Sequence, residues 1–176
     1  MLYVCYDNEG YMNTGYQRSS TTSLGSSTST TPAGAAINGK EQQQKYLPLI
    51  MAMHNVEYCA TASPSNMPDL VAKIQKGLEA SKRGFAYLHV FSPCPTGWKF
   101  APDQSIEVAK KAVASNMFPI WERENGKFKL TANRKPITAA DFVKGIGKFK
   151  KLDEAEIAAI QSMVDARWEL LNKLAE

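Results

Sequence analysis

The residues with the greatest potential for chemistry lie in one short segment, residues 7–17, directly after an apolar run at residues 2–6. The segment combines carboxylates, asparagine amides, a threonine hydroxyl and glycines. Mg²⁺ prefers octahedral oxygen ligands and is commonly shared between protein oxygens and a diphosphate. The side-chain oxygen of Asn8 and the backbone carbonyl of Gly10 could both face one such ion at the end of a strand. The segment therefore predicts a cation and phosphate site, and a surface Asx turn without a ligand is the alternative.

A Ser/Thr-rich stretch at residues 19–31 follows this segment, with Leu24 and Gly25 as its main interruptions. Its composition alone is typical of a flexible linker. Loops beside strand ends in α/β sheets are, however, where ligands bind. Because the stretch directly follows the polar segment, we favour a ligand-binding loop over a linker.

The three cysteines are an odd number, and no signal peptide is recognisable. A disulfide framework is therefore not expected, and a reducing cytoplasm is the expected compartment. Cys5 and Cys59 lie in apolar runs, which predicts buried free thiols. Cys94 stands between two prolines, in a loop that could present a thiolate. No Cys-x-x-Cys pair occurs in the chain, so spacing alone assigns Cys94 no role.

The histidines and tryptophans invite functional readings, but most have structural alternatives. His54 ends an expected helix and His89 lies within an apolar run, so both are expected to be structural rather than catalytic bases. Trp98, beside the cysteine loop, could shield a metal cluster from water or pack in the core. Trp121 and Trp168 are expected in the core.

Composition limits the classes of protein to which the chain could belong. Its 176 residues are 44% hydrophobic and 22% charged, which predicts one globular domain with a real core. No apolar run approaches the roughly 20 residues that a membrane helix needs, so a soluble protein is expected. A net charge of +4 from scattered basic residues is weak support for nucleic-acid binding. The densest basic group is expected to be a solvated face, with a docking patch for an acidic electron carrier as the alternative: Lys144, Lys148, Lys150 and Lys151.

Periodicity predicts strands alternating with helices along the chain. Strands are expected at 2–6, 57–62 and 85–91, and helices at about 40–54, 68–84, 105–115 and 138–146. A hairpin of 119–123 and 127–131 turns at an Asn-Gly pair. A final helix begins with a capping box at Asp153 and Glu156, and its apolar face is formed by Ile157, Ile160, Val164, Trp168 and Leu171. The fold class is therefore α/β, with a mostly parallel sheet flanked by helices and a helical C-terminal tail.

The string from Tyr3 to Ser19, Tyr-Val-Cys-Tyr-Asp-Asn-Glu-Gly-Tyr-Met-Asn-Thr-Gly-Tyr-Gln-Arg-Ser, resembles a known family. This family is the thiamine-diphosphate-binding beta subunit of 2-oxoacid:ferredoxin oxidoreductases, which include pyruvate:ferredoxin oxidoreductase. The resemblance continues through residues 31–34, 39–40, 60–63 and 92–98. It implies that residues 1–130 form the C-terminal part of a thiamine-diphosphate-binding domain. Residues 131–176 would then be a C-terminal helical extension.

The resemblance also implies roles for individual residues. Asn8 and the main-chain oxygen of Gly10 would hold the Mg²⁺ that bridges the diphosphate of thiamine diphosphate. Asn13 would lie near the thiazolium and the substrate, where its neutral amide could stabilise a developing oxyanion. Asn13 is therefore the expected catalytic residue. Cys94, in the Ser-Pro-Cys segment, would supply one thiolate of a [4Fe-4S] cluster.

Three further residues of the same segment would support the loop and contact the cofactor. They are Asp7, Tyr11 and Thr14, and a purely structural role is at least as well founded for each. The first half of the thiamine motif, Gly-Asp-Gly, and the other cluster cysteines are absent from this sequence. The chain alone is therefore expected to be inactive, as the C-terminal piece of a split or truncated subunit.

The implied activity is oxidative decarboxylation of a 2-oxoacid, with pyruvate as the first expectation, to an acyl-coenzyme A. Electrons would pass through iron–sulfur clusters to ferredoxin. Expected partners are the other subunits, ferredoxin, the 2-oxoacid and coenzyme A, and neither nucleic acid nor a membrane. The alternative is a non-catalytic remnant or assembly module of such a complex.

Overall fold

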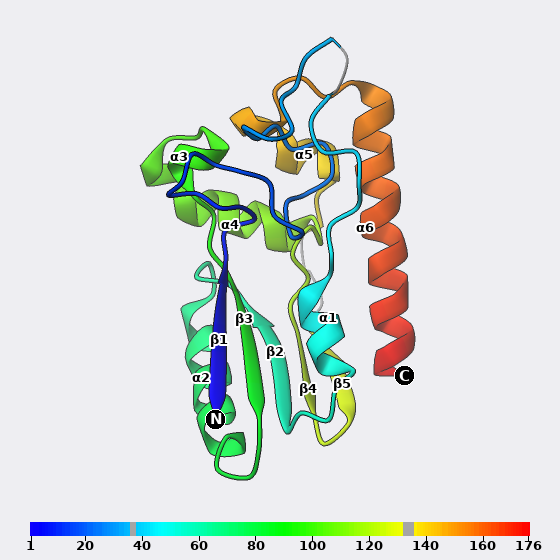
Figure 1. The fold of residues 1–176 in the computed structure, drawn as a ribbon. Coiled ribbons are helices and arrows are strands. Elements are labelled where there is room, and N and C mark those ends of the chain that lie inside the picture. The colour runs from blue at the N-terminus through cyan, green and yellow to red at the C-terminus, as the bar shows by residue number, and fades with distance from the viewer. Residues whose placement is uncertain (36–37, 132–135) are drawn as a thin grey trace.

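The computed structural model describes residues 1–35, 38–131 and 136–176. Its centre is a five-stranded sheet with the strand order β1-β3-β2-β4-β5 (Figure 1). The strands β1 (Leu2–Asp7), β3 (Ala86–Phe91) and β2 (Tyr58–Ala62) are parallel, whereas β4 (Trp121–Glu124) and β5 (Lys127–Leu130) are antiparallel. The predicted α/β class with a mostly parallel sheet is confirmed.

The parallel strands are the buried part of the sheet. Every residue of β2 and β3 is buried, as the continuous apolar runs predict for strands covered on both faces. In the register of the sheet, Asp7 lies beside Phe91 and Ala62 lies beside Val90. The carboxyl ends of these strands therefore meet at one edge, where the loops after β1 and β3 become neighbours.

Helices cover both faces of the sheet. Helix α2 (Met67–Ala80) packs on one face, where Leu2 and Val4 of β1 contribute to the core beneath it. Asn66 caps this helix by accepting a hydrogen bond from the backbone N–H of Asp69 (3.3 Å). On the opposite face lies α1 (Leu47–Ala52), and α6 (Glu154–Ala175) packs beside β5.

The prediction of a helix at about residues 40–54 is wrong for the first half of this range. Only Leu47–Ala52 is helical, with Pro48 in its first turn. The backbone before it pairs with the Ser/Thr-rich stretch instead: Lys40 N–H donates to the carbonyl of Ser26 (3.1 Å) and Lys45 N–H to that of Ser20 (2.8 Å). A proline suits the first helical turn but disfavours helical backbone in the residue before it, which explains the late start.

The predicted antiparallel hairpin is confirmed and is formed by β4 and β5. Asn125 and Gly126 both have positive φ, 50° and 78°, the conformation of a type I′ turn. Glu124 pairs with Lys127 across the turn. The Asn-Gly pair therefore sets the register of β4 and β5.

The C-terminal half adds short helices above the strand ends. They are α3 (Pro95–Trp98), η1 (Pro102–Gln104), α4 (Ser105–Ala114), α5 (Ala139–Val143) and η2 (Gly147–Phe149), and α6 runs from this region down beside the sheet. Helix α5 is shorter than expected, because Lys144 is extended and Gly145 has a φ of 84°. The capping box of Asp153 and Glu156 is present at the start of α6, as predicted. The division of the chain at residues 130 and 131 stays a prediction.

The apolar residues of α6 face the core as their spacing predicts. Ile160, Val164 and Leu171 are buried, and Trp168 packs against the cluster around Trp121. Among the described residues, no helix combines the length and apolar character needed to cross a bilayer.

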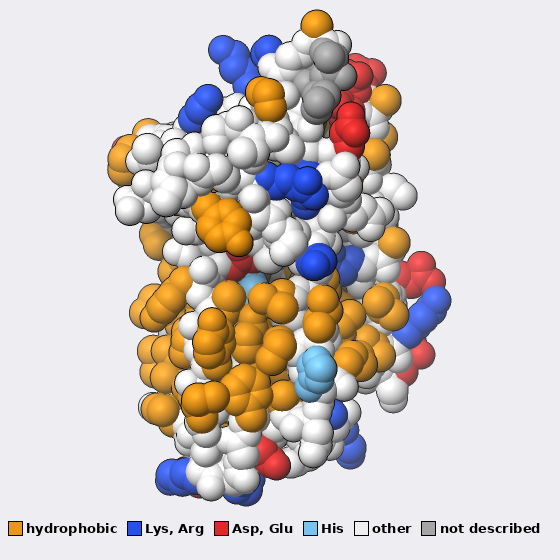
Figure 2. All heavy atoms as spheres, in the orientation of Figure 1, with side chains coloured by type: hydrophobic (Ala, Val, Ile, Leu, Met, Phe, Trp, Pro, Cys, Tyr) orange, Lys and Arg blue, Asp and Glu red, His pale blue; other side chains and the backbone are white. Residues whose placement is uncertain are grey.

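One face of β1 lies open. Figure 2 shows hydrophobic side chains gathered over β1 and α1 in the lower half of the view. On this face Tyr3 is 53% exposed and its ring stacks on that of Tyr87, while Ile50 and Met53 near α1 are exposed as well. Helix α2 covers only the other face.

Candidate functional site

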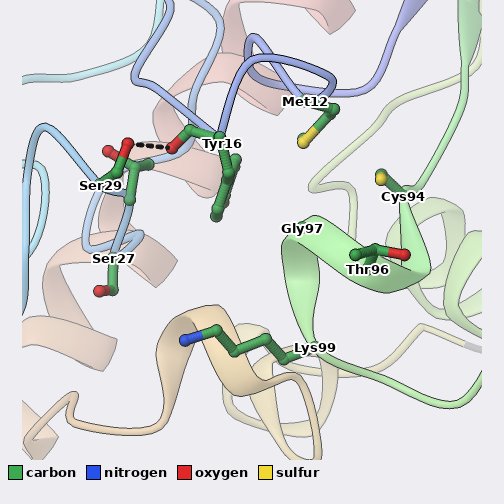
Figure 3. A pocket seen from close by; sticks show the side chains of 10 residues that line it. Met12, Tyr16, Ser27, Ser29, Cys94, Thr96, Gly97 and Lys99 are labelled. Atoms are coloured by element: carbon green, nitrogen blue, oxygen red, sulfur yellow. Dashed lines mark hydrogen bonds between the residues drawn. The ribbon is translucent and has the colours of Figure 1, made fainter.

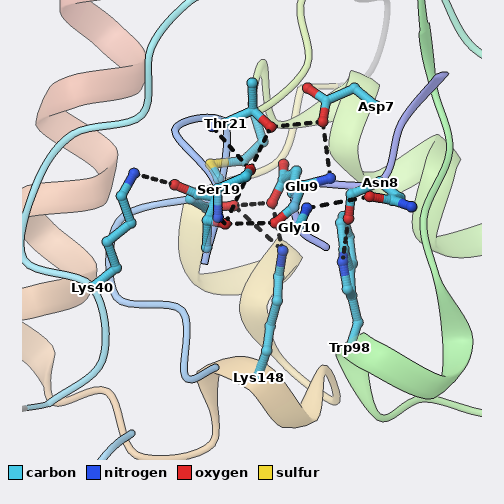
Figure 4. Close-up of polar contacts among 12 residues, drawn as sticks. Asp7, Asn8, Glu9, Gly10, Ser19, Thr21, Lys40, Trp98 and Lys148 are labelled. Atoms are coloured by element: carbon cyan, nitrogen blue, oxygen red, sulfur yellow. Dashed lines mark hydrogen bonds and ion pairs between the residues drawn. The ribbon is translucent and has the colours of Figure 1, made fainter. Parts of the chain in front are cut away.

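The loop after β1 begins with two successive Asx turns. Asp7 Oδ1 accepts a hydrogen bond from Glu9 N–H (2.9 Å), and Asn8 Oδ1 accepts one from Gly10 N–H (3.2 Å) (Figure 4). The local hydrogen bonding is therefore that of the Asx-turn alternative. The turns also fix the positions of the Asn8 amide and the Gly10 backbone, the two groups expected to face a cation.

A buried ion pair between Glu9 and Lys148 stabilises the loop after β1. Glu9 has a φ of 61° and is buried, and its Oε2 lies 2.6 Å from Nζ of Lys148 on η2. Ser23 Oγ donates to the same carboxylate, and Thr22 Oγ1 donates to the Glu9 carbonyl (2.6 Å). Lys148 Nζ lies 3.2 Å from the centre of the Trp98 ring.

The burial of Lys148 corrects the sequence interpretation. Lys148 was expected on a solvated face, yet it is 1% exposed. Burial lowers the pKa of Lys148, while the charge and hydrogen bond of Glu9 act in the opposite direction. In the sequence, only the apolar neighbours Ile146 and Phe149 indicate that Lys148 is buried. No nearby residue identifies Glu9 as its partner.

Trp98 fixes the loop from a third direction. Its indole Nε1–H donates to the carbonyl of Asn8 (3.0 Å), and its ring is fully buried (Figure 4). Trp98 therefore packs in the core and also hydrogen-bonds to the loop after β1.

Asp7 joins the loop to the buried centre of the sheet. Its Oδ2 lies 2.9 Å from His89 Nε2, and His89 Nδ1 lies 2.7 Å from the hydroxyl of Tyr87. Burial alone would lower the pKa of His89, but hydrogen bonds and charges of Asp7 and Cys5 raise it to about 9. His89 is therefore positively charged at neutral pH, and both its ring nitrogens are engaged, as expected for a structural histidine. His54 is exposed.

The Ser/Thr-rich stretch is a packed loop and not a free linker. Several of its hydroxyl side chains are buried: Thr22, Ser23, Ser26 and Thr28. Lys40 Nζ donates to the Thr22 carbonyl (2.5 Å), and Ser27 N–H donates to the carbonyl of Lys148 (2.8 Å). Burial and the charge of Arg18 lower the pKa of Lys40 to about 8. The linker alternative is therefore wrong for this segment.

Residues of the polar segment, of the Ser/Thr-rich loop and of 94–99 meet at a pocket of about 420 Å³ (Figure 3). The polar segment contributes Met12, Gly15 and Tyr16, and the loop after β3 contributes Cys94. The Ser/Thr-rich loop and α3 complete the lining with Ser27, Thr28, Ser29, Thr96, Gly97 and Lys99. The pocket is lined by segments that follow the carboxyl ends of β1 and β3, and this end of the sheet is the usual place for a ligand in an α/β protein.

Tyr16 offers this pocket an unused hydrogen-bonding group. Its hydroxyl is buried and has no partner among the described residues. Burial, with the charges of Glu9 and Cys94, raises the pKa of Tyr16, so the hydroxyl is a neutral donor. A Cβ at Gly97 would meet the sulfur of Met12, so α3 packs closely against the polar segment at this point. Sequence reasoning missed Tyr16.

The predicted site residues divide into two groups. Asp7, Asn8 and Gly10 form the fixed turn, and Cys94 lines the pocket. The side chains of Tyr11, Asn13 and Thr14 are exposed, and they are not among the pocket's lining residues: Tyr11 is 63% exposed, and Thr14 Oγ1 donates to Gln17 (2.5 Å). The roles expected for all of these residues stay predictions.

The residues present could supply some of the ligands of the expected Mg²⁺ site and of the expected [4Fe-4S] cluster, but not all of them. The Asn8 and Gly10 oxygens match the preference of Mg²⁺ for oxygen ligands. Cys94 is the one thiol lining the pocket in the described chain, since Cys5 and Cys59 lie within strands, and all three are free. No group of three or more His, Cys, Asp or Glu residues suited to a metal occurs among the described residues. A [4Fe-4S] cluster requires further thiolates.

Comparison with known proteins identifies relatives that cover the chain almost completely. No protein-family model matches it. It is 44% identical to the NADH-dependent phenylglyoxylate dehydrogenase subunit beta of Aromatoleum evansii, over 100% of this chain and 40% of that protein. It is 44% identical to the pyruvate synthase subunit PorB of Thermotoga maritima, over 100% of this chain and 56% of that protein. The ketoisovalerate oxidoreductase subunit VorB of Pyrococcus horikoshii is 40% identical, over 99% of this chain and 57% of its own length.

This chain is a homologue of the beta subunits of 2-oxoacid:ferredoxin oxidoreductases. The resemblance read from residues 3–19 and the later segments is therefore confirmed. The chain spans 40 to 57% of the length of these relatives.

Proposed function

We propose that this chain forms part of the thiamine-diphosphate-binding subunit of a 2-oxoacid oxidoreductase. The observation that carries the proposal is that the polar segment after β1 and Cys94 line the same pocket. The names of the relatives support the substrate class, because pyruvate, ketoisovalerate and phenylglyoxylate are all 2-oxoacids. Pyruvate is the first substrate to test.

The chain's residues would act around the cofactor as follows. Asn8 Oδ1 and the Gly10 carbonyl would bind Mg²⁺ beside the diphosphate, with Asp7, Tyr11 and Thr14 supporting the loop. Thiamine diphosphate, when bound, supplies the carbanion stabilisation that decarboxylation of a 2-oxoacid requires. Asn13 would direct its amide N–H toward a developing oxyanion of the substrate.

Cys94 would connect this site to electron transfer. Its thiolate would be one of the ligands of a [4Fe-4S] cluster, with the remaining ligands and the Gly-Asp-Gly half supplied outside this chain. Coenzyme A would accept the acyl group, and ferredoxin would accept the electrons. We propose a cytoplasmic location, since the three cysteines are free thiols. On its own the chain would not turn over.

The test is calorimetry of thiamine diphosphate binding with Mg²⁺. It is performed on the chain alone and after co-expression with a fragment carrying Gly-Asp-Gly and the missing cysteines. We expect binding only in the reconstituted pair. Asn8→Ala is expected to lower the affinity by about tenfold or more, and Asn55→Ala, at an exposed asparagine outside the site, is the matched control.

A second variant separates binding from catalysis. Asn13→Ala is expected to keep the affinity for the cofactor and to lower kcat for 2-oxoacid turnover, because its amide acts on the substrate. Absence of binding in the pair, with both pieces folded and associated, would contradict the proposal. That result would support the alternative of a non-catalytic assembly module.

A further inference from the structure

A further pocket lies between α1 and α6, and it shares no lining residue with the 420 Å³ pocket. Its volume is about 270 Å³. Sites for drug-sized ligands measure roughly 300–1,000 Å³, so this pocket suits a smaller molecule. Its lining includes Gln44 and Tyr46 before α1, Leu49 of α1, and Met163, Arg167 and Leu170 of α6.

Arg167 brings a positive charge to this pocket that no carboxylate balances. It is partly buried and forms no ion pair with any described residue. Its Nη1–H donates to the carbonyl of Met117 (3.3 Å), and its Cζ lies 4.9 Å from the centre of the Tyr46 ring. Burial lowers the pKa of Arg167, with Tyr46 and Glu9 acting in the opposite direction, and a guanidinium stays protonated in proteins. An anion in the pocket would stabilise this charge.

The carboxylates that are closest to Arg167 in sequence are already engaged. Asp165 accepts a hydrogen bond from Gln161 Nε2 (2.8 Å), and Glu169 pairs with Lys173 (2.6 Å). Among the described residues, no carboxylate lines the pocket. The planar guanidinium of Arg167 presents parallel N–H groups, whose geometry matches the two oxygens of a carboxylate. The anion that fits is therefore a carboxylate supplied by a ligand.

Gln44 adds a polar atom without a partner. Its Oε1 is buried and has no hydrogen-bond partner among the described residues. Gln44 precedes Tyr46 by two residues, and the Tyr46 ring lies against Arg167, so the amide and the guanidinium line neighbouring parts of the pocket. The Tyr46 hydroxyl is itself engaged, because it accepts a hydrogen bond from Trp121 Nε1 (2.6 Å). A buried carbonyl oxygen without a partner is stabilised by a hydrogen-bond donor.

We propose that this pocket binds a small aliphatic hydroxy acid. The carboxylate of the ligand pairs with Arg167, and its hydroxyl donates a hydrogen bond to Gln44 Oε1. The aliphatic tail contacts the apolar part of the lining, formed by Leu49, Met163 and Leu170. Leu170 is 46% exposed, so the pocket opens to solvent at α6. The inference goes beyond the proposed function and does not depend on it.

Two other classes of small anion fit the same groups less well. An α-amino acid would place an ammonium close to Arg167, and no carboxylate of the described lining would balance it. An inorganic phosphate would leave the apolar side chains of α1 and α6 without a contact. A hydroxy acid satisfies the cation, the amide oxygen and the apolar surface together.

The test is calorimetry of 2-hydroxy-4-methylpentanoate binding to the full chain, with an affinity expected in the millimolar range. Arg167→Lys is expected to weaken binding by about tenfold, because lysine keeps the charge and lacks the planar pair of N–H groups. Arg123→Lys is the matched control. Arg123 also donates to a backbone carbonyl, that of Val56 (3.2 Å), but it lies outside the pocket, so its substitution should leave the affinity unchanged. Circular dichroism checks that each variant is folded.

Matched ligands test the individual contacts. The uncharged 2-hydroxy-4-methylpentanamide is expected to bind about tenfold more weakly, because it has no carboxylate for Arg167. The oxo acid 4-methyl-2-oxopentanoate is expected to bind about fivefold more weakly, because it has no donor for Gln44. Gln44→Met removes that acceptor and should make the hydroxy acid and the oxo acid bind equally. A purely structural role of Gln44 would leave the preference unchanged.

Four results would overturn the proposal. They are an absence of binding to the wild-type chain, equal losses in Arg123→Lys and Arg167→Lys, and binding of inorganic phosphate as tight as that of the hydroxy acid. The fourth is tighter binding of a short peptide through its C-terminal carboxylate, which would assign the pocket to a protein partner. Thiamine diphosphate binding in the reconstituted pair is expected to be unaffected by Arg167→Lys, so either proposal can fail while the other stands.

Discussion

The loop end of the sheet and the open face of β1 are organised in opposite ways. At the loop end, charged groups are buried and paired within the chain: Glu9 with Lys148, and Asp7 with His89. On the open face, apolar side chains such as Tyr3 are exposed, and β3 is the one strand that pairs with β1 in the described residues. Polar groups are enclosed where ligands are expected, and apolar groups face outward elsewhere.

This difference separates what the chain completes by itself from what it leaves open. The turn at Asn8 and Gly10 is fixed by residues of this chain, so its geometry does not depend on a bound ligand. A contiguous apolar surface such as that over β1 is typical of an interaction site. Substitutions at the loop end should therefore affect stability far more than substitutions on the open face of β1.

The largest effect is expected at the buried ion pair. Lys148→Met removes the cation and leaves the Glu9 carboxylate buried without its charge partner. Breaking a buried pair in this way costs about 3 to 5 kcal/mol of the free energy of unfolding. Urea unfolding of the chain, followed by circular dichroism, measures the loss.

Two variants test whether pairing is the cause. Lys144→Met makes the same change at an exposed lysine of the same region and is expected to alter stability by less than about 0.5 kcal/mol. The double variant Glu9→Gln/Lys148→Met removes both charges and is expected to recover part of the loss. A double variant no more stable than Lys148→Met would contradict the assignment.

The same pair shows where sequence reasoning ends. Elements specified by neighbouring residues were predictable: the Asn125-Gly126 turn, the capping box of α6 and the continuous apolar run of β3. Glu9 and Lys148 are brought together by the tertiary fold across almost the whole chain, and no local pattern encodes their contact. The helix predicted before Pro48 is wrong for a different reason, because the local restriction that a proline places on the preceding residue was overlooked.

The candidate site also contains residues that the sequence indicates and residues that only the fold brings together. The polar segment and the Ser/Thr-rich loop were predicted to form a ligand site, and Cys94 to bind part of a metal cluster. One pocket is lined by residues of all three, and the roles expected for them stay predictions. Tyr16 was not predicted, because its importance depends on which side chains remain without partners after folding.

The second effect is a loss of stability at alkaline pH. His89 has a folded-state pKa of about 9, above its ordinary value of 6.5. Its interaction with Asp7 therefore contributes fully below pH 6.5 and is lost as the pH rises through 9. We expect the free energy of unfolding to fall by up to about 3 kcal/mol between pH 6.5 and 10.

His89→Gln keeps a polar side chain and removes the titrating ring. Its stability is expected to be lower at pH 6.5 and to change little toward pH 10. Urea unfolding across this range gives both curves, and an NMR titration of the imidazole gives the pKa directly. A wild-type curve that stays level or rises with pH would exclude a charged His89.

The smallest effect is expected on the open face of β1. Tyr3→Thr keeps a side chain that favours strands but removes the ring stacked on Tyr87, with 5.9 Å between ring centres. Because Tyr3 is 53% exposed, the expected loss is about 1 kcal/mol or less in the free energy of unfolding. Tyr87→Thr, at the buried partner of the same stack, is expected to cost about 3 kcal/mol or more. Urea unfolding of both variants measures the difference. Equal losses would mean that the face of β1 is part of this chain's own core, and the contrast with the loop end would disappear.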